Sequence, residues 1–387
     1  MFLEAETSFG VGVLQQLPLN ESFVFSPLSI ALALSLVHIG AKGGTKTEIG
    51  NAICKGANDD QLKQHYSFFT SAFANPVKGV EINLANKAFI NKKYPLKKSY
   101  LTDIANAYKA SAENVDFSDQ TKAAAVINGF VKEHTKGRIN EIIEKSKILH
   151  LRHLAECPSS YVKVKLPFKI PLEADSTFEI CLAADSMAFL INALYLNVKW
   201  VDPFFPQNTV QADFFARNGQ DRKAHICEEV QILALNYTNP EYRFIVMLPK
   251  QAVSLQKFIQ GLSGGKFQSL LKTLKGTNVQ IKIPKMKVET SSEMKKILTS
   301  IGIKSAFEDG ADFSPMSDVP LKVSEVTHKA VIDVNEAGTT ASAATVVEML
   351  PGSAGGFFPD PIEFTADHPF LYAITFNNHP LFMGAFV

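Results

Sequence analysis

A long, largely apolar run over residues 188–200 most constrains what this chain can fold into. The run reads AFLINALYLNVKW. It is shorter than the stretch of about 18 apolar residues that a membrane-spanning helix needs. It contains few residues that break regular structure, and it lacks the polar alternation of a half-exposed strand. The pattern predicts a β-strand that is buried on both faces, as in the interior of a large sheet.

Apolar residues at helical spacing predict helices in the first third of the chain. A start signal at Ser26-Pro27 and a closing Gly40 bound one of them, and a further helix is expected over residues 122–144, broken late by Gly137. The apolar sets are Phe9, Val13, Leu14 and Leu17; then Leu28, Leu32, Leu36 and Ile39; then Val126, Phe130 and Val131.

The remainder of the chain is predicted to be rich in strands. Alternating residues indicate strands over 242–248, 331–334 and 371–376, and Asn377–Pro380 indicates a hairpin turn into residues 381–387. Residues 279–288 alternate with a change of phase at Pro284, which indicates one strand with a bulge or kink. Since no repeat or linker separates two cores, residues 1–387 are expected to form a single α+β domain.

The charge balance and the cysteines narrow the class of protein. Lys plus Arg is 39 and Asp plus Glu is 38, so bulk nucleic-acid binding has no electrostatic support. The N-terminal residues lack the basic region, apolar core and cleavage site of a signal peptide. We therefore expect a cytoplasmic protein with no membrane partner, or an extracellular one if the start of the chain is missing. Cys54, Cys157, Cys181 and Cys227 have no metal-binding spacing and are expected to be reduced thiols.

No motif for catalysis, a metal or a cofactor is found. Residues 261–266 read GLSGGK, but they lack the glycine spacing of a phosphate loop, and Phe267 stands where Ser or Thr would follow. There is no GxSxG elbow and no HExxH sequence. His150 and His153 are three apart, with no third ligand placed to complete a metal site. We expect no catalytic residue, no metal site and no cofactor.

Several motifs, in order along the chain, resemble the serpin family of protease inhibitors. The resemblance covers the chain from about residue 7 to its end. It implies a helical N-terminal part, a large sheet A, smaller sheets B and C, and an exposed reactive-centre loop. The motifs are Ser26-Pro27-Leu28-Ser29-Ile30, Gly40-Ala41-Lys42-Gly43, Asn192 in FLINALYLNVKW, Trp200 with Pro203-Phe204, Ile283-Pro284-Lys285, LKVSEVTHKAVIDVNEAG over 321–338, and His379-Pro380-Leu381-Phe382-Met383-Gly384.

Two segments depart from the family pattern. The chain is longer than expected between Gly137 and Asn192, with the excess at about residues 147–182, and shorter than expected near residues 220–229. A retained intron or a mispredicted exon would explain both departures, and so would a genuine variant. The insertion would follow the helix that lies over sheet A, which must yield when the loop inserts.

The resemblance implies inhibition by a suicide-substrate mechanism. A protease attacks the reactive-centre loop, here within residues 336–366, and forms an acyl-enzyme; the cleaved loop then enters sheet A as a new strand. Inserting residues must be small and uncharged, because an unpaired buried charge would cost several kcal/mol. The residues from Thr339 to Thr345 meet this requirement, and Gly338 permits the backbone turn. The hinge residues are Glu336, Gly338, Thr339, Ala341, Ser342, Ala343 and Ala344.

The resemblance also implies roles for two sets of residues near the strands of sheet A that would separate to admit the loop. Ser26, Ser29, Asn192 and His328, named here the shutter residues, match a buried polar cluster whose members must satisfy one another or water. A structural role and a gating role are both open for them. Trp200 and Lys285, named here the breach residues, match the entry point of the inserting strand, where Lys285 would pair with Glu336.

Loop length selects the bond offered to the protease. Counting about seventeen residues from Glu336, at about 3.3 Å per residue of inserted strand, gives the Gly352–Ser353 bond. Met349 and Leu350 are alternatives, although Pro351 makes Leu350 a poor choice. Glycine suits an elastase-like protease; a chymotrypsin-like serine protease or a papain-like cysteine protease is also open as the partner. The chain is expected to be a monomer. The alternative function is that of a non-inhibitory binding or chaperone-like serpin, or of an inactive variant.

Overall fold

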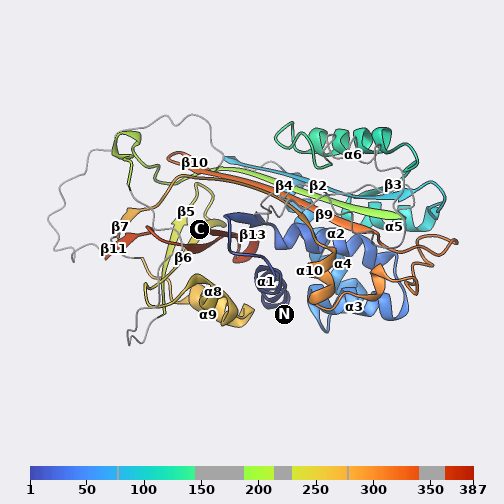
Figure 1. Ribbon diagram of the computed structural model, residues 1–387, viewed down its shortest axis with the longest axis horizontal. Coiled ribbons are helices and arrows are strands. Elements are labelled where there is room, and N and C mark those ends of the chain that lie inside the picture. The colour runs from blue at the N-terminus through green and yellow to red at the C-terminus, as the bar shows by residue number, and fades with distance from the viewer. Residues whose placement is uncertain (76–77, 144–186, 213–228, 277–278, 340–361) are drawn as a thin grey trace, which may run out of the picture.

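The computed structural model describes residues 1–75, 78–143, 187–212, 229–276, 279–339 and 362–387, and every structural statement below refers to them. Helices pack around three sheets (Figure 1). This arrangement confirms the predicted α+β class. None of the helices in these ranges combines the length and the apolar character that crossing a membrane requires.

The first part of the chain is helical, as predicted. The second helix has the expected bounds: the Ser26 hydroxyl accepts a hydrogen bond from the Ser29 backbone N–H at 3.1 Å, and Gly40 is the C-cap. The helices of this part are α1 (Phe2–Leu14), α2 (Pro27–Ile39), α3 (Gly43–Cys54), α4 (Asp59–Ala74) and α5 (Lys98–Tyr108).

The helix expected over 122–144 is α6 (Gln120–His134), which ends ten residues earlier than predicted. It ends because Lys136 and Gly137 take φ angles of +51° and +73°, outside the right-handed helical region, and the backbone N–H of Gly137 donates to the carbonyl of Lys132 at 2.7 Å. The predicted apolar face was also partly wrong, since Val126 is 41% exposed. Ala123, Ala124, Ile127 and Val131 form the buried face instead.

The largest sheet has six strands, and the apolar run lies in its middle. β4 is buried along nearly all its length, which confirms the prediction of a strand covered on both faces. Leu190 and Leu194 belong to the core shared with α2, whereas Phe189 and Ile191 pack beneath α6 on the opposite face (Figure 1). The strand order is β3 (Ser111–Val115), β2 (Val80–Asn91), β4 (Ala188–Lys199), β10 (Gly338–Thr339), β9 (Glu325–Asn335) and β8 (Met286–Glu293).

A second sheet of five strands holds the C-terminal hairpin. The hairpin turns at Asn377 and Asn378, whose φ angles are +48° and +69°. Two positive φ values in a two-residue turn match the right-handed twist of the flanking strands, and asparagine tolerates them. The strand order is β1 (Phe23–Phe25), β13 (His379–Phe386), β12 (Phe370–Phe376), β6 (Tyr242–Pro249) and β5 (Val230–Asn236).

The third sheet corrects the interpretation of Pro284. β7 (Val279–Lys282) pairs in parallel with β11 (Ile362–Thr365), while β8 belongs to the six-stranded sheet. Residues 279–288 are therefore two strands in two sheets, not one bulged strand. Pro284 lies between them, where its missing N–H costs no ladder hydrogen bond.

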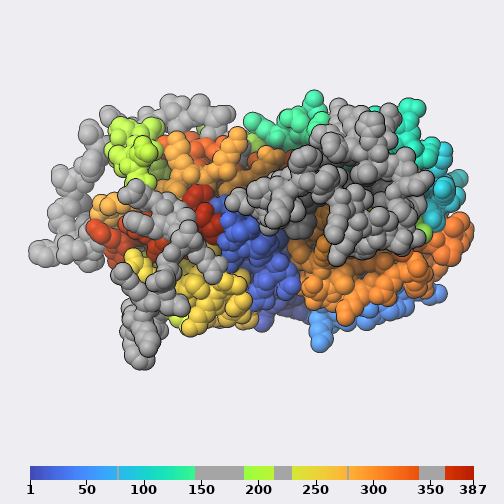
Figure 2. Space-filling model, viewed as in Figure 1, coloured from blue at the N-terminus to red at the C-terminus, as the bar shows by residue number. Residues whose placement is uncertain are grey.

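The remaining short helices lie around the N-terminal segment. On the face shown in Figure 2, the blue N-terminal residues lie between the yellow segment with α8 and α9 and the orange segment with α10. These helices are α8 (Leu255–Gln260), α9 (Gly264–Lys272) and α10 (Lys295–Ser300). Of the two 3-10 turns, η2 (Ser305–Phe307) packs against α3, and η1 (Pro206–Asn208) lies apart from the N-terminal segment, near Glu336.

Candidate functional site

The middle of the six-stranded sheet contains a partly opened junction between β4 and β9, named here the seam. The two strands pair directly and in parallel over seven residue pairs, from Phe189 opposite Glu325 to Tyr195 opposite Val331. Beyond this stretch β10 lies between them and is antiparallel to both. Thr339 faces Val198 on one side and Val334 on the other. The chain that follows β9 thus already starts a strand inside the sheet.

The close packing of β10 explains its sequence. Gly338 has a φ of +156°, and a Cβ at this position would lie 2.2 Å from the Val198 carbonyl oxygen. Only glycine fits such a close approach of two backbones. Thr339 is 1% exposed, and its hydroxyl lies 2.5 Å from the Tyr237 hydroxyl, which is also buried. Burial raises the pKa of Tyr237, so the pair stays neutral and hydrogen-bonded.

Only part of the predicted hinge and loop can be placed. The rest lies outside the described residues: Ala341, Ser342, Ala343 and Ala344 of the hinge, the bond Gly352–Ser353 with its alternatives Met349 and Leu350, and the atypical segments 147–182 and 220–228.

The breach residues lie at the entrance to the seam. Trp200 is buried and stacks on Tyr237, with ring centroids 4.4 Å apart and planes 6° from parallel. Its indole N–H donates to the carbonyl of Asn335 at 2.9 Å, and its backbone N–H donates to the carbonyl of Ala337 at 3.0 Å. Trp200 therefore holds together the end of β4 and the turn between β9 and β10.

The predicted ion pair between Lys285 and Glu336 is present, with Nζ and Oε1 3.1 Å apart. Lys285 is largely exposed, so the pair alone contributes little stability. Glu336 also accepts a hydrogen bond from the Thr209 hydroxyl at 2.7 Å. That hydrogen bond, together with Lys285, holds the pKa of Glu336 below its ordinary value. Sequence patterns gave no signal for Thr209 or Tyr237, because neither belongs to a spaced motif.

The four shutter residues come together and are almost completely buried. The side-chain amide of Asn192 donates to the Ser29 hydroxyl at 2.5 Å and to the Ser29 carbonyl at 2.6 Å. Its oxygen accepts from Nδ1 of His328 across the seam. A fifth member, Asn86 on β2, accepts from the Asn192 amide and was missed, since a lone asparagine in a strand carries no signal.

The hydrogen bonds fix the protonation of His328. The backbone N–H of Ser26 donates to His328 Nε2 at 2.9 Å, so Nε2 must be unprotonated. The proton therefore resides on Nδ1, which donates to the Asn192 oxygen. Complete burial lowers the pKa of His328 to about 3, so the ring is neutral at physiological pH. One neutral histidine thus connects β9 to both β4 and the start of α2.

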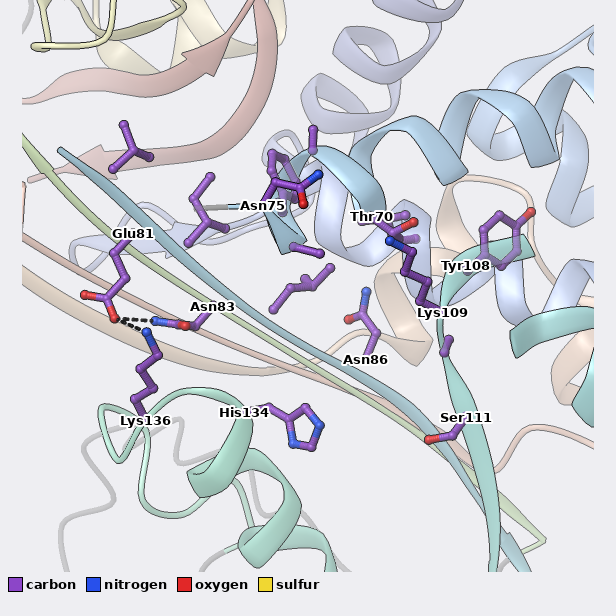
Figure 3. Close-up of a pocket in the computed structure, with 18 of the residues that line it drawn as sticks. Thr70, Asn75, Glu81, Asn83, Asn86, Tyr108, Lys109, Ser111, His134 and Lys136 are labelled. Atoms are coloured by element: carbon purple, nitrogen blue, oxygen red, sulfur yellow. Dashed lines mark hydrogen bonds and ion pairs between the residues drawn. The ribbon is translucent and has the colours of Figure 1, made fainter. Parts of the chain in front are cut away.

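A cavity lies on the flank of the same sheet. It has a volume of about 600 Å³ and is lined by residues of β2, α4 and α6 (Figure 3). Asn86 lines it, so the cavity reaches the polar row of the shutter. At its rim Lys136 donates to Glu81 at 2.7 Å, which lowers the pKa of Glu81 (Figure 3).

A family model described as Serpin (serine protease inhibitor) matches residues 4–165 and 174–387. The chain is a serpin. Serpin B6 of Macaca fascicularis is 30% identical, over 99% of this chain and 98% of its own length. Iripin-2 of Ixodes ricinus is 29% identical, over 96% of this chain and 89% of its own length. The family membership that the motifs predicted is confirmed.

Solved serpin structures share the fold. The thermophilic serpin tengpin in its native state aligns with a TM-score of 0.80 and 26% identity, over 100% of this chain and 93% of its own. Uncleaved ovalbumin aligns with a TM-score of 0.76 at 22% identity, over 99% of this serpin and 98% of its own chain, which shows the fold alone. The family description names an inhibitor rather than an enzyme and makes a protease the general class of partner.

Proposed function

We propose that this serpin inhibits a protease as a suicide substrate, by inserting its cleaved reactive-centre loop between β4 and β9. The observation that supports this most directly is β10. Its two residues already pair with both strands and run in the direction that an inserting strand must take. Gly338 and Thr339 would thus be the first residues of a longer strand.

The register of β10 assigns a place to each residue that would follow. Thr339 lies opposite Val198 of β4 and Val334 of β9. Each further residue would move one position back along both strands. Thr345 would then arrive opposite Asn192 and His328, and Met349 would reach Ala188, the first residue of β4. Both flanking strands give the same positions, because Asn192 and His328 already face each other.

Side-chain alternation supports the insertion of this segment into the seam. Residues with odd numbers would point to the face of Val198 and Asn192, toward α2, and those with even numbers toward α6. The odd set is uncharged throughout: Thr339, Ala341, Ala343, Thr345, Val347 and Met349. The even set carries one charge, on Glu348, at the far end beside Phe189: Thr340, Ser342, Ala344, Val346 and Glu348.

The same register supports Gly352–Ser353 as the bait bond. An inserted strand would reach the end of β4 at Met349. Pro351 and Gly352 would then extend beyond the sheet and keep the attached protease outside it. A cut after Met349 would leave no such spacer. A glycine before the cut suits an elastase-like protease with a narrow specificity pocket.

The test is to mix the serpin with pancreatic elastase, chymotrypsin and papain and to look for a covalent complex that survives boiling in detergent. We expect such a complex with at least one serine protease. Cleaved serpin without complex, at every enzyme ratio, would overturn the proposal. Thr345→Arg should turn the inhibitor into a substrate, because it would bury an unpaired charge beside Asn192. The control, Thr345→Ser, keeps the hydroxyl and should inhibit normally.

A non-inhibitory binding serpin is the second candidate. It is favoured by the fold shared with ovalbumin and with a thyroxine-binding globulin complexed with thyroxine. Thermal unfolding before and after loop cleavage separates the two. An inserting serpin becomes much more heat-stable after cleavage, and a non-inserting one does not. The cytoplasmic location stays a prediction from the N-terminal residues.

A further inference from the structure

Three side chains from distant parts of the sequence meet outside the seam, where α1, α4 and β13 come together. Glu6 lies on α1, His65 on α4 and His379 at the start of β13. His65 Nε2 lies 2.6 Å from one oxygen of the Glu6 carboxylate, and His379 Nδ1 contacts the other oxygen. One ligand atom from each residue lies within 4.8 Å of the other two. Their separation in sequence, at 6, 65 and 379, explains why no spacing motif revealed them.

The carboxylate at the centre of this cluster is unusual for its burial. The Glu6 side chain is 1% exposed, whereas His65 and His379 are 15% and 18% exposed. Burial raises the pKa of Glu6, but hydrogen bonds from His379 and His65 outweigh it and leave the pKa below its ordinary value. A negative charge is thus held inside the protein with one imidazole ring against each carboxylate oxygen. Both histidine side chains are partly exposed to solvent.

The surrounding residues hold the imidazoles in place. Phe2 stacks on His65 with ring centroids 3.9 Å apart, and Phe69 packs edge-on against both His65 and His379 at 5.1 and 5.2 Å. On the other side, the Gln268 amide donates to the Thr7 hydroxyl and to the carbonyl of Asn378. These contacts fix the residues next to Glu6 and His379. Preorganised ligands of this kind lose little freedom when they bind a metal.

We propose that Glu6, His65 and His379 form a binding site for a divalent transition-metal ion, with zinc as the preferred occupant. The ligand atoms would be one carboxylate oxygen, His65 Nε2 and His379 Nδ1. Two imidazoles and one carboxylate are a ligand set that zinc accepts, at about 2.0–2.2 Å, with water at the fourth position. The imidazoles would bind as neutral rings, with the remaining proton on the nitrogen opposite the metal.

The site would act as a clamp between the N-terminal helix and the C-terminal hairpin. A divalent cation would more than neutralise the buried carboxylate, and its three bonds would connect α1, α4 and β13. Binding to the folded state alone stabilises it, by an amount set by the metal concentration relative to Kd. This proposal does not depend on the inhibitory function.

The test uses the full chain freed of metal with EDTA. Zinc binding is measured by calorimetry, and cobalt(II) is added as a spectroscopic substitute. We expect one high-affinity site, visible d–d absorption typical of four or five ligands, and a rise in Tm of about 3 °C at a hundredfold excess of zinc over Kd. X-ray absorption of the zinc form should show nitrogen and oxygen ligands. No binding even at millimolar zinc, or a sulfur ligand, would overturn the proposal.

Variants locate the site. His65→Asn and His379→Asn should each weaken zinc binding at least tenfold while Tm in EDTA shows a folded protein. The matched control is His368→Asn: His368 is half-buried and pairs with Asp367 at 2.7 Å, but it belongs to no three-ligand cluster of the described residues. The control should bind zinc normally. An equal loss of zinc affinity in His368→Asn, or no loss in His65→Asn and His379→Asn, would contradict this location of the metal site. If a variant fails to fold, the X-ray absorption result decides.

Discussion

The contact between Tyr237 and Thr339 allows a quantitative test of how the hinge is held. The two hydroxyls are buried and 2.5 Å apart, and neither has another partner among the residues the structure describes. Tyr237→Phe keeps the stack on Trp200 but leaves the Thr339 hydroxyl unpaired, and Thr339→Val does the reverse. An unpaired buried hydroxyl costs about 1–2 kcal/mol, within the usual range for such groups. Each single change should weaken the docking of β10 by that amount.

The double variant distinguishes this hydrogen bond from general packing. Removing both hydroxyls leaves no unpaired group, so the combined cost should be well below the sum of the single costs. The assay is amide exchange of the folded protein, with mass spectrometry of the peptides that contain Gly338 and Thr339 after exchange is quenched. A cost of 1–2 kcal/mol speeds exchange through local opening about 5- to 30-fold. The reasoning would be refuted if the costs of the two single variants added up in the double variant, or if neither single variant changed the exchange rate of β10.

Three further predictions concern the same region. Gly338→Ala should expel β10 from the sheet, because the new Cβ would lie 2.2 Å from the Val198 carbonyl oxygen. The fluorescence of Trp200, the one tryptophan, should then shift to the red, and an unchanged emission spectrum would contradict this prediction. Between about pH 6.5 and 3, His328 binds a proton in the unfolded chain but not in the folded protein, so the free energy of unfolding falls as the pH falls. Urea unfolding of His328→Gln should show a dependence on pH that is shallower by up to about 1.4 kcal/mol per pH unit. Lys285→Ala should change the free energy of unfolding by less than about 1 kcal/mol, since Lys285 is 58% exposed; a larger loss in the same assay would show that the ion pair matters more than its exposure indicates.

Local patterns predicted the elements whose signals are themselves local. β4, α2 and the Asn377-Asn378 hairpin follow from an apolar run, a capped helix and turn chemistry within a few residues. The prediction of one bulged strand around Pro284 was wrong, because β7 pairs with β11, about eighty residues further along the chain. A phase shift within one strand and a crossing between two sheets look the same in sequence. Only the pairing partner distinguishes them.

The site residues could be assembled only through the family resemblance. Ser26, Asn192 and His328 are ordinary polar residues in apolar segments, and no spacing rule brings them together. Their contacts depend on α2 packing under β4 and β9. The resemblance also could not supply Tyr237, which contacts the hinge through one hydroxyl. Such contacts depend on side-chain geometry that arises after the sheet has formed.

The structure of the seam explains why a polar row is useful in the middle of an apolar sheet. Opening β4 from β9 breaks seven direct parallel pairs and the hydrogen bond from His328 to Asn192. An inserted strand would form antiparallel pairs on both sides, so backbone hydrogen bonds are gained overall. The side-chain bond would be lost unless the arriving residue replaced it, and in the β10 register that residue is Thr345, whose hydroxyl can both donate and accept. Under the proposed insertion, the shutter would resist opening before cleavage without leaving buried polar groups unpaired afterwards. An apolar row would offer no such directional bond across the seam and would hold it closed by packing alone.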